Sequence, residues 1–180
     1  MKKTILPLLL LASFSLSHAQ TKGPELGIGV DAGIPVGSLS ESHKFGIGGT
    51  LKFAYNFNPS TAITFQSGYM SFIGKDISPE DGGGIIDKWP NLNFIPFKFG
   101  GRYTFTGGFY IEPQLGFTSM STKFMGYTSS TTGFTYAINV GYRATPGVDI
   151  SARHETISKE GNGSFIGLRV AYNFLLEKKR

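Results

Sequence analysis

Apolar and polar residues alternate with a period of two along most of the chain from about residue 25 to residue 176. Successive side chains of a β-strand point to opposite faces, so this period predicts strands with one apolar and one polar face. In 166–174, for example, Ile, Leu, Val, Tyr and Phe alternate with Gly, Arg, Ala and Asn. The pattern predicts eight strands, at about 26–34, 44–57, 61–73, 95–105, 109–118, 134–143, 148–155 and 166–176.

The connections between these segments are alternately long and short. The short ones contain Pro or Gly and predict tight turns. In chain order the connections are 35–44, 58–60, 74–91, 106–108, 122–132, 145–147 and about 157–164. Outer-membrane barrels have short periplasmic turns and longer extracellular loops. We therefore predict an all-β fold, an eight-stranded antiparallel up-and-down transmembrane barrel with four extracellular loops and both termini in the periplasm.

The composition of the two faces indicates which one points outward. Alternation alone also fits a soluble lipocalin-like barrel. Such a barrel has the same two faces but turns the polar one outward and the apolar one inward. Here the apolar face is rich in aromatic residues and almost free of charge, as a lipid-facing surface is. The polar face is too rich in glycine for a solvated exterior and too charged for a ligand cavity. We predict that the apolar face meets lipid, and a soluble carrier is the alternative.

The polar face then fills the lumen, which in an eight-stranded barrel is just wide enough for side chains. Charges in such a lumen are costly unless they are paired, so we predict ion pairs rather than a conducting pore. Arg102 and Glu112 flank the turn at 106–108 and are predicted to pair. The predicted lumen network is Asp31, Lys52, Lys98, Arg102, Glu112, Arg143, Asp149, Arg153, Glu155 and Arg169.

Aromatic residues gather beside the short turns and near the C-terminal end. Amphipathic rings are enriched at the headgroup level of both membrane surfaces, and in barrels they form girdles. Ordinary aromatic residues of a soluble sheet are the alternative explanation. The predicted periplasmic girdle is Tyr55, Phe57, Tyr103, Phe105, Phe109, Tyr142, Tyr172 and Phe174.

The N-terminus has the layout of a secretory signal peptide. Lys2 and Lys3 precede an apolar stretch at 5–16, and Ser17-His18-Ala19 is a small-residue cleavage pattern. The stretch is shorter than the roughly 20 residues that a membrane-spanning helix needs. We predict that residues 1–19 are removed and that 20–180 form a single barrel domain.

The composition agrees with a membrane barrel. The chain has 25 Gly, 16 Phe and 8 Tyr but only 16% charged residues, against about 25% in soluble domains. The loss of Lys2 and Lys3 lowers the net charge from +5 to +3, and the remaining basic residues are scattered, so we do not expect nucleic-acid binding. The absence of Cys excludes disulfides and thiolate metal sites.

Three segments resemble the small eight-stranded outer-membrane barrels of the OmpA/OmpX type, in particular the outer-membrane β-barrel domain common in Bacteroidetes-like bacteria. They are 95–103 (IPFKFGGRY), 109–116 (FYIEPQLG) and 166–174 (IGLRVAYNF). The resemblance covers nearly the whole mature chain, and its motifs are architectural rather than catalytic. Barrels of this type usually end on an aromatic residue that the insertion machinery is thought to read. Here six residues follow Phe174, so that signal would be internal.

Two segments superficially suggest ligand binding. The glycines in 27–33 are similar to a dinucleotide-binding loop, but alternation and Pro35 argue against the helix that such a loop requires. The connection 74–91 carries Asp76, Glu80, Asp81 and Asp87 around three glycines, without the ligand spacing of a calcium loop. We expect a glycine-lined strand, a solvated loop and no cofactor or metal.

His154 is the one candidate for catalysis. Its position in the alternating pattern predicts that it faces lipid, near the extracellular end of its strand. Thr156 and Ser158 follow it in the sequence. A base beside a hydroxyl is the minimum for nucleophilic catalysis. The arrangement weakly resembles the outer-membrane lipid A deacylases, although Thr156 stands where that family has Ser, and no clear Glu begins the last strand.

These observations favour a non-enzymatic structural or surface-binding barrel. A lipid A-modifying hydrolase that uses His154 and Thr156 is the alternative. The expected partners are outer-membrane lipid, the barrel insertion machinery and a possible surface ligand at 74–91, and the protein is expected to be a monomer.

Overall fold

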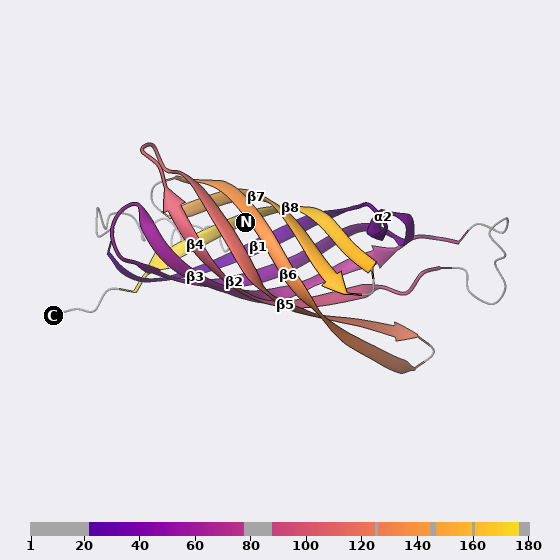
Figure 1. Cartoon of the computed structure of the whole chain (residues 1–180). Helices are drawn as coiled ribbons and strands as arrows, with labels where there is room; N and C mark the ends of the chain where they lie inside the picture. The colour runs from indigo at the N-terminus through magenta and orange to yellow at the C-terminus, as the bar shows by residue number, and fades with distance from the viewer. Residues whose placement is uncertain (1–21, 78–87, 125, 145–146, 160, 177–180) are drawn as a thin grey trace, which may run out of the picture.

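The computed structural model describes residues 22–77, 88–124, 126–144, 147–159 and 161–176. Its strands form one closed antiparallel barrel in the order of the sequence (Figure 1). The elements are β1 (Gly23–Val36), α2 (Leu39–Ser42), β2 (His43–Asn56), β3 (Thr61–Gly74), β4 (Leu92–Thr104), β5 (Phe109–Phe124), β6 (Tyr127–Ala144), β7 (Val148–Lys159) and β8 (Gly161–Leu175). The predicted eight-stranded up-and-down barrel is confirmed. The proposed signal peptide, residues 1–19, lies outside the described residues.

The barrel closes where β1 pairs with β8, from Glu25 opposite Leu175 to Val36 opposite Ser164. Closure leaves no free sheet edge around the wall, and a sheet that crosses lipid must satisfy every backbone group in this way. Among the described residues, no helix is long and apolar enough to cross a membrane.

The two ends of the barrel differ. We call the end that carries the β2–β3, β4–β5 and β6–β7 connections the turn end, and the opposite end the loop end. At the turn end the Asn58 carboxamide oxygen accepts hydrogen bonds from the backbone N–H groups of Ser60 and Thr61, both at 2.8 Å. Gly107 and Gly108 adopt φ of 90° and 87°, which favours glycine. The first residue of β1 and the last of β8 also lie at the turn end.

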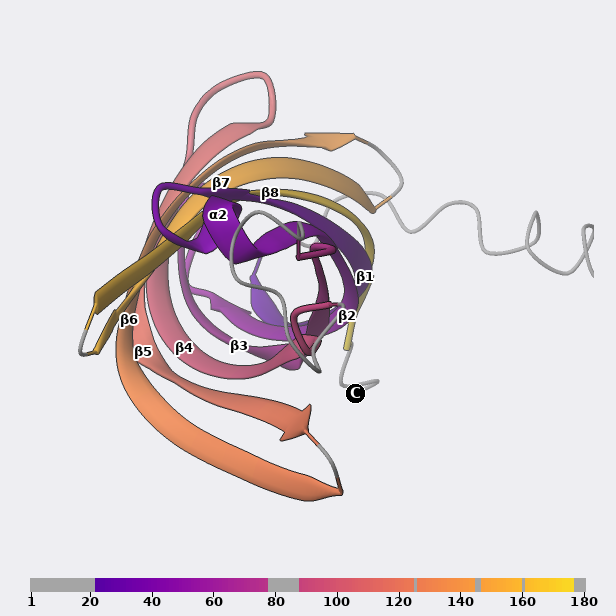
Figure 2. The ribbon, with the colours of Figure 1, turned by 90° about the vertical axis from the view of Figure 1, so that its right-hand side faces the viewer.

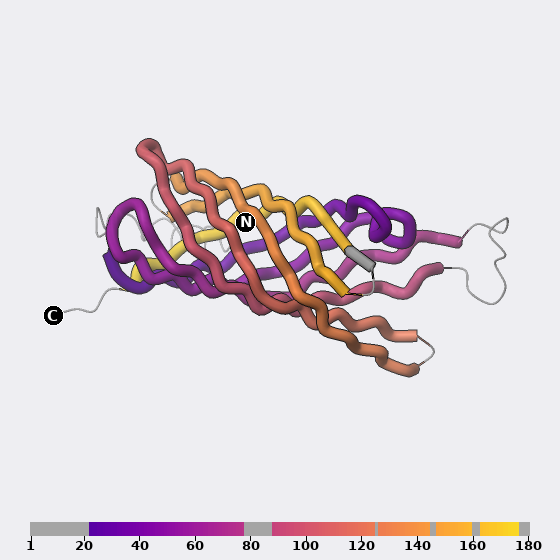
Figure 3. Tube along the Cα trace, in the orientation of Figure 1, coloured from indigo at the N-terminus to yellow at the C-terminus, as the bar shows by residue number. Residues whose placement is uncertain are grey.

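At the loop end the structure corrects two predicted loops. β5 and β6 stay paired as far as Phe124 opposite Tyr127, and β7 and β8 as far as Lys159 opposite Gly161. The segments 122–132 and 157–164 are therefore mostly strand, and the β5–β6 hairpin extends away from the barrel wall (Figures 1 and 3). The period-two pattern stops there because both faces of the hairpin meet solvent, although its backbone pairing continues.

The loop end carries two further connections, between β1 and β2 and between β3 and β4. The first contains α2, which lies against β1, β2 and β8. The second begins with a bridge between Asp76 and Lys88, and its residues 78–87 lie outside the described part. In Figure 2, where the loop end faces the viewer, α2 lies within the outline of the barrel.

The distribution of side chains is inverted relative to a soluble domain. Large apolar side chains cover the outer wall, and Phe99 and Val30 are 67% and 65% exposed. Charged and polar side chains fill the inside, where Lys98, Glu112 and Gln66 are completely buried. This arrangement contradicts the soluble lipocalin-like alternative, because a soluble barrel would expose its polar face.

Candidate functional site

The lumen contains all ten residues of the predicted charge network. Nine of them are buried, and Arg143, at the turn end, is 26% exposed along its side chain. Glycine on the inner face makes room for them. A Cβ at Gly167 would lie 3.0 Å from Arg153, and one at Gly141 would lie 2.6 Å from the Tyr110 hydroxyl. The interior is therefore filled by large polar side chains packed over small ones.

Nearest the turn end, Glu25 connects two arginines. Its carboxylate lies 2.6 Å from Arg143 Nη2 and 3.5 Å from Arg102 Nη1. Asn56 completes the group, since it donates to Glu25 at 3.3 Å and accepts from Arg102 at 2.9 Å. Sequence analysis missed Glu25, because the first strand was expected to begin at Leu26. Glu25 lies an even number of residues from Asp31 and so faces the same side of the strand, which could have revealed its inward position.

In the middle of the barrel, Glu112 is the acceptor for three groups. Lys52 Nζ lies 3.0 and 3.1 Å from its two oxygens, the Thr64 hydroxyl donates at 3.1 Å, and Gln114 donates at 2.6 Å. Arg102 is not among these direct partners, so the predicted Arg102–Glu112 pair is wrong. The two residues lie on adjacent strands, but their side chains reach across the bore to partners on β1 and β2.

A second central group links β1, β2, β4 and β7. Asp31 binds Arg153 directly and accepts from the Thr50 hydroxyl at 2.8 Å. Arg153 Nε lies 2.9 Å from a Glu155 oxygen, as an ion pair without hydrogen-bond geometry, and the same oxygen lies 2.5 Å from Lys98 Nζ. These contacts form one continuous chain of alternating charge.

Arg169 of β8 connects this group, through Thr50, to Asp149. Its Nε donates to the Thr50 hydroxyl at 2.8 Å, and its Nη1 lies 3.4 Å from an Asp149 oxygen that also accepts from the Tyr110 hydroxyl at 2.9 Å. Among the described residues, and with Glu25 included, the lumen holds five carboxylates and six cations, so this set is nearly neutral. Buried charges persist only when they are paired in this way.

The loop end of the lumen is apolar, which the sequence analysis did not anticipate. Leu39, Met70, Phe72, Phe94, Ile157 and Phe165 are all buried there and form one cluster, with Leu92 and Met120 packed against it. We call these eight residues the apolar plug. The sequence pattern could have revealed this cluster. Near the loop-end termini of β3, β4, β7 and β8, apolar residues stand at the alternate positions that face the lumen.

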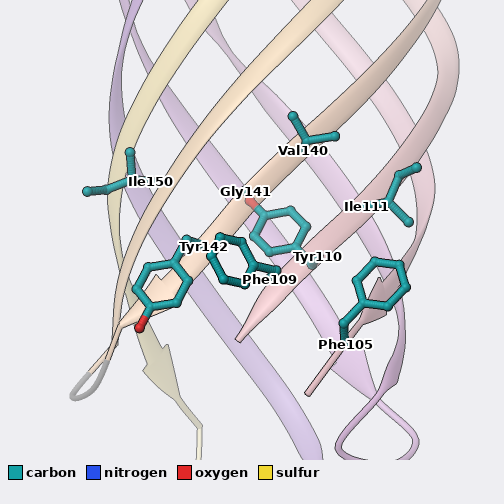
Figure 4. A pocket seen from close by; sticks show the side chains of 8 residues that line it. All are labelled: Phe105, Phe109, Tyr110, Ile111, Val140, Gly141, Tyr142 and Ile150. Carbon is teal, nitrogen blue, oxygen red and sulfur yellow. The ribbon is translucent and has the colours of Figure 1, made fainter. Parts of the chain in front are cut away.

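On the outer wall, the eight proposed girdle residues form four ring pairs near the turn end. The pairs are Tyr55–Phe57, Tyr103–Phe105, Phe109–Tyr142 and Tyr172–Phe174, with ring centroids 4.8 to 5.4 Å apart. Beside these rings the wall has an open hollow of about 470 Å³ (Figure 4). Its lining residues are Phe105, Phe109, Tyr110, Ile111, Val140, Gly141, Tyr142 and Ile150. None of the described residues that line this hollow is charged, so the hollow is suited to acyl chains.

The structure separates the two candidate catalytic residues. His154 is exposed on the outer wall of β7, between Ile138 of β6 and Ile166 of β8. Thr156 is buried, and its hydroxyl lies 2.9 Å from the hydroxyl of Ser164. The hydroxyl thus has a hydroxyl partner rather than the imidazole that nucleophilic activation requires.

The acidic residues proposed for the second loop are mostly outside the described residues. Glu80, Asp81 and Asp87 lie there, whereas Asp76 is exposed and accepts a hydrogen bond from Lys44 at 2.8 Å. That hydrogen bond and the charge of Lys44 lower the pKa of the Asp76 carboxyl. The described part of this loop therefore contains a surface ion pair.

Comparisons with known proteins agree with this architecture. The family model described as outer membrane protein beta-barrel domain matches residues 6–174. No curated protein matches the chain. Similar solved structures include the N-terminal β-barrel domain of Pseudomonas aeruginosa OprF, with a TM-score of 0.61 and 12% identity over 85% of this chain and 99% of that one.

Two further structures are similar to the same extent. Neisserial surface protein A has a TM-score of 0.58 and 17% identity over 84% of this chain and 97% of that one. Ail, the attachment invasion locus protein of Yersinia pestis, has a TM-score of 0.56 and 15% identity over 85% and 99%. At these identities the likeness concerns the fold alone. The match over 6–174 shows more: the chain belongs to the outer-membrane protein β-barrel domain family and is an outer-membrane protein.

Proposed function

We propose that this protein is a non-conducting, non-enzymatic outer-membrane barrel that acts as a structural or surface-binding protein. The observation that carries the proposal is the filled lumen. Paired charges occupy the turn end and the middle, and the apolar plug occupies the loop end. Such an interior offers no bore for transport, so contact with other molecules falls to the outer wall and the loop end.

Purified protein in planar bilayers tests this proposal directly. It should show no steady conductance at any applied voltage that the bilayer tolerates. A stable open channel would overturn the non-conducting part of the proposal, since ions could pass only if the lumen were not filled as described.

The binding surface that we propose includes only part of the four predicted extracellular loops. It comprises the second loop, within 74–91, and the tip of the β5–β6 hairpin. That tip carries Tyr127, which is 82% exposed, followed by the exposed hydroxyl residues Thr128, Ser129, Ser130, Thr131 and Thr132. Exposed aromatic and hydroxyl side chains are suited to adaptable surface recognition.

The orientation is part of the same proposal. We place the loop end outside the cell and both termini in the periplasm, because outer-membrane barrels have their short connections on the periplasmic side. A protease added to intact cells should cleave within 74–91 and leave the turns at 58–60 and 106–108 intact. Cleavage at those turns in intact cells would reverse the orientation.

We further propose a secreted precursor cleaved after residue 19, a single domain over 20–180, and a monomer inserted by the cellular barrel machinery into lipid. The exposed apolar wall supports contact with lipid all around the barrel. Hydrolysis of lipid A is the weaker candidate, because Thr156 is bound to Ser164 and not poised beside His154.

A further inference from the structure

The apolar plug divides the lumen into two chemically different compartments. The ring centroids of Phe72 and Phe94 lie 5.1 Å apart, and those of Phe72 and Phe165 lie 5.2 Å apart. Phe72 is completely buried. The plug draws on α2, β3, β4, β5, β7 and β8, so it extends across the bore rather than along one side of it.

The walls around the plug are shaped to accept it. A Cβ at Gly46 would lie 2.7 Å from the Phe72 ring, and a Cβ at Gly33 would lie 3.1 Å from the same ring. A Cβ at Gly133 would lie 2.7 Å from the Ile157 side chain. Any larger residue at these three positions would compete with the plug for space, so the plug fills the bore tightly at this level.

The compartment on the turn side of the plug has the properties of a hydrated layer. Several of its buried polar atoms have no protein hydrogen-bond partner, and these are Gln66 Nε2, Gln114 Oε1, Asp149 Oδ2, Arg169 Nη2 and Asn173 Nδ2. Buried polar atoms of this kind are usually satisfied by water. Arg143, at its turn-end opening, is 26% exposed. Arg153 marks the boundary, since its guanidinium lies 5.4 Å from the Phe165 ring centroid.

We propose that the apolar plug, and not the ion-pair network, is the permeability barrier of this protein. A tightly packed apolar constriction excludes water and ions because it offers them no hydrogen bonds in place of their hydration. The ion-pair network holds the strands together but admits water from the turn end. This inference rests on the proposed non-conducting function and assigns that function to specific residues.

Proteoliposomes and planar bilayers test the inference with three variants. Phe72→Ala opens the centre of the plug, and Phe72→Leu, as the matched control, keeps apolar bulk at the same position. A Lys52→Met/Glu112→Gln double variant discharges a central ion pair and leaves the plug intact. Osmotic water permeability by stopped-flow light scattering and single-channel conductance are measured for each, after heat-modifiable electrophoretic mobility has shown that the barrel is folded.

We expect Phe72→Ala to raise water permeability several-fold above the unaltered protein and to produce discrete conductance events, whereas the other two variants stay closed. Met70→Gln replaces one plug residue by a polar one of similar size, and it should leak in the same direction if Phe72→Ala does not fold. Closed Phe72→Ala and Met70→Gln barrels would overturn the inference, as would conduction by the ion-pair variant. A leak in the unaltered protein would instead overturn the proposed function itself.

Discussion

The Lys52–Glu112 pair provides the sharpest test of how the lumen stabilises the barrel. Both side chains are almost fully buried, at 2% and 0% exposure, and the Lys52 ammonium contacts both carboxylate oxygens at 3.0 and 3.1 Å. Removing one partner of a buried pair costs about 3–5 kcal/mol, because the other charge is left uncompensated. We expect Glu112→Gln to lower the free energy of unfolding by that amount, since it leaves Lys52 facing a neutral amide.

Lys52→Met should cost less than Glu112→Gln. In Lys52→Met the carboxylate of Glu112 would keep its hydrogen bonds from Thr64 at 3.1 Å and from Gln114 at 2.6 Å. In Glu112→Gln the Lys52 ammonium would keep no other hydrogen bond among those of the described residues. The double variant removes both charges at once, so its cost should be smaller than the sum of the single costs by roughly 1–3 kcal/mol.

Urea unfolding in lipid vesicles, followed by circular dichroism and electrophoretic mobility, gives the four free energies of this cycle. The exposed Lys44–Asp76 pair is the matched control, with side chains 46% and 71% exposed and a separation of 2.8 Å. Exposed pairs contribute about 0–1 kcal/mol, so its coupling energy should be near zero. Additive costs for Lys52 and Glu112, or a coupling no larger than that of the surface pair, would refute the reasoning.

Three further predictions concern the wall, the location and the candidate catalytic residue. Phe99→Arg, in mid-strand, should cost about 2–4 kcal/mol in vesicle refolding, whereas Phe57→Arg beside a turn should cost about 0–1 kcal/mol. Equal costs would contradict the assigned membrane depth. The mature protein should fractionate with the outer membrane and begin at Gln20, which N-terminal sequencing checks; an N-terminus at residue 1 would show that no signal is removed. His154→Ala should leave the lipid A mass spectrum unchanged, and a changed spectrum would revive the hydrolase.

The ion-pair network and the apolar plug stabilise different levels of the barrel along its axis. Opposite charges on strands that are not neighbours, such as Asp31 on β1 and Arg153 on β7, connect strands that share no backbone ladder. The plug adds apolar contact where α2 and the loops meet the strands. The barrel therefore has interior contacts at every level described, which suits a scaffold that displays its loop end.

Much of this architecture follows from local pattern. The strands, their two faces and the positions of the girdle residues could be predicted because each depends on residues two positions apart or on a short turn. The Phe109–Tyr142 ring pair, by contrast, depends on the register between β5 and β6. Alternation between Gly or charged residues and apolar ones fixes which face each side chain takes, whichever strand lies next to it. The inward position of Glu25 and of Phe72 follows the same parity, although the sequence analysis did not use it for either residue.

The partners inside the lumen were decided only by the tertiary structure. Lys98 meets Glu155, and Lys52 rather than Arg102 meets Glu112. These contacts depend on the radius of the bore and the stagger of the strands, because long side chains reach across the lumen instead of along the ladder. The length of the β5–β6 hairpin was likewise hidden, since a segment with both faces in water keeps its backbone hydrogen bonds but loses the alternation that would reveal them.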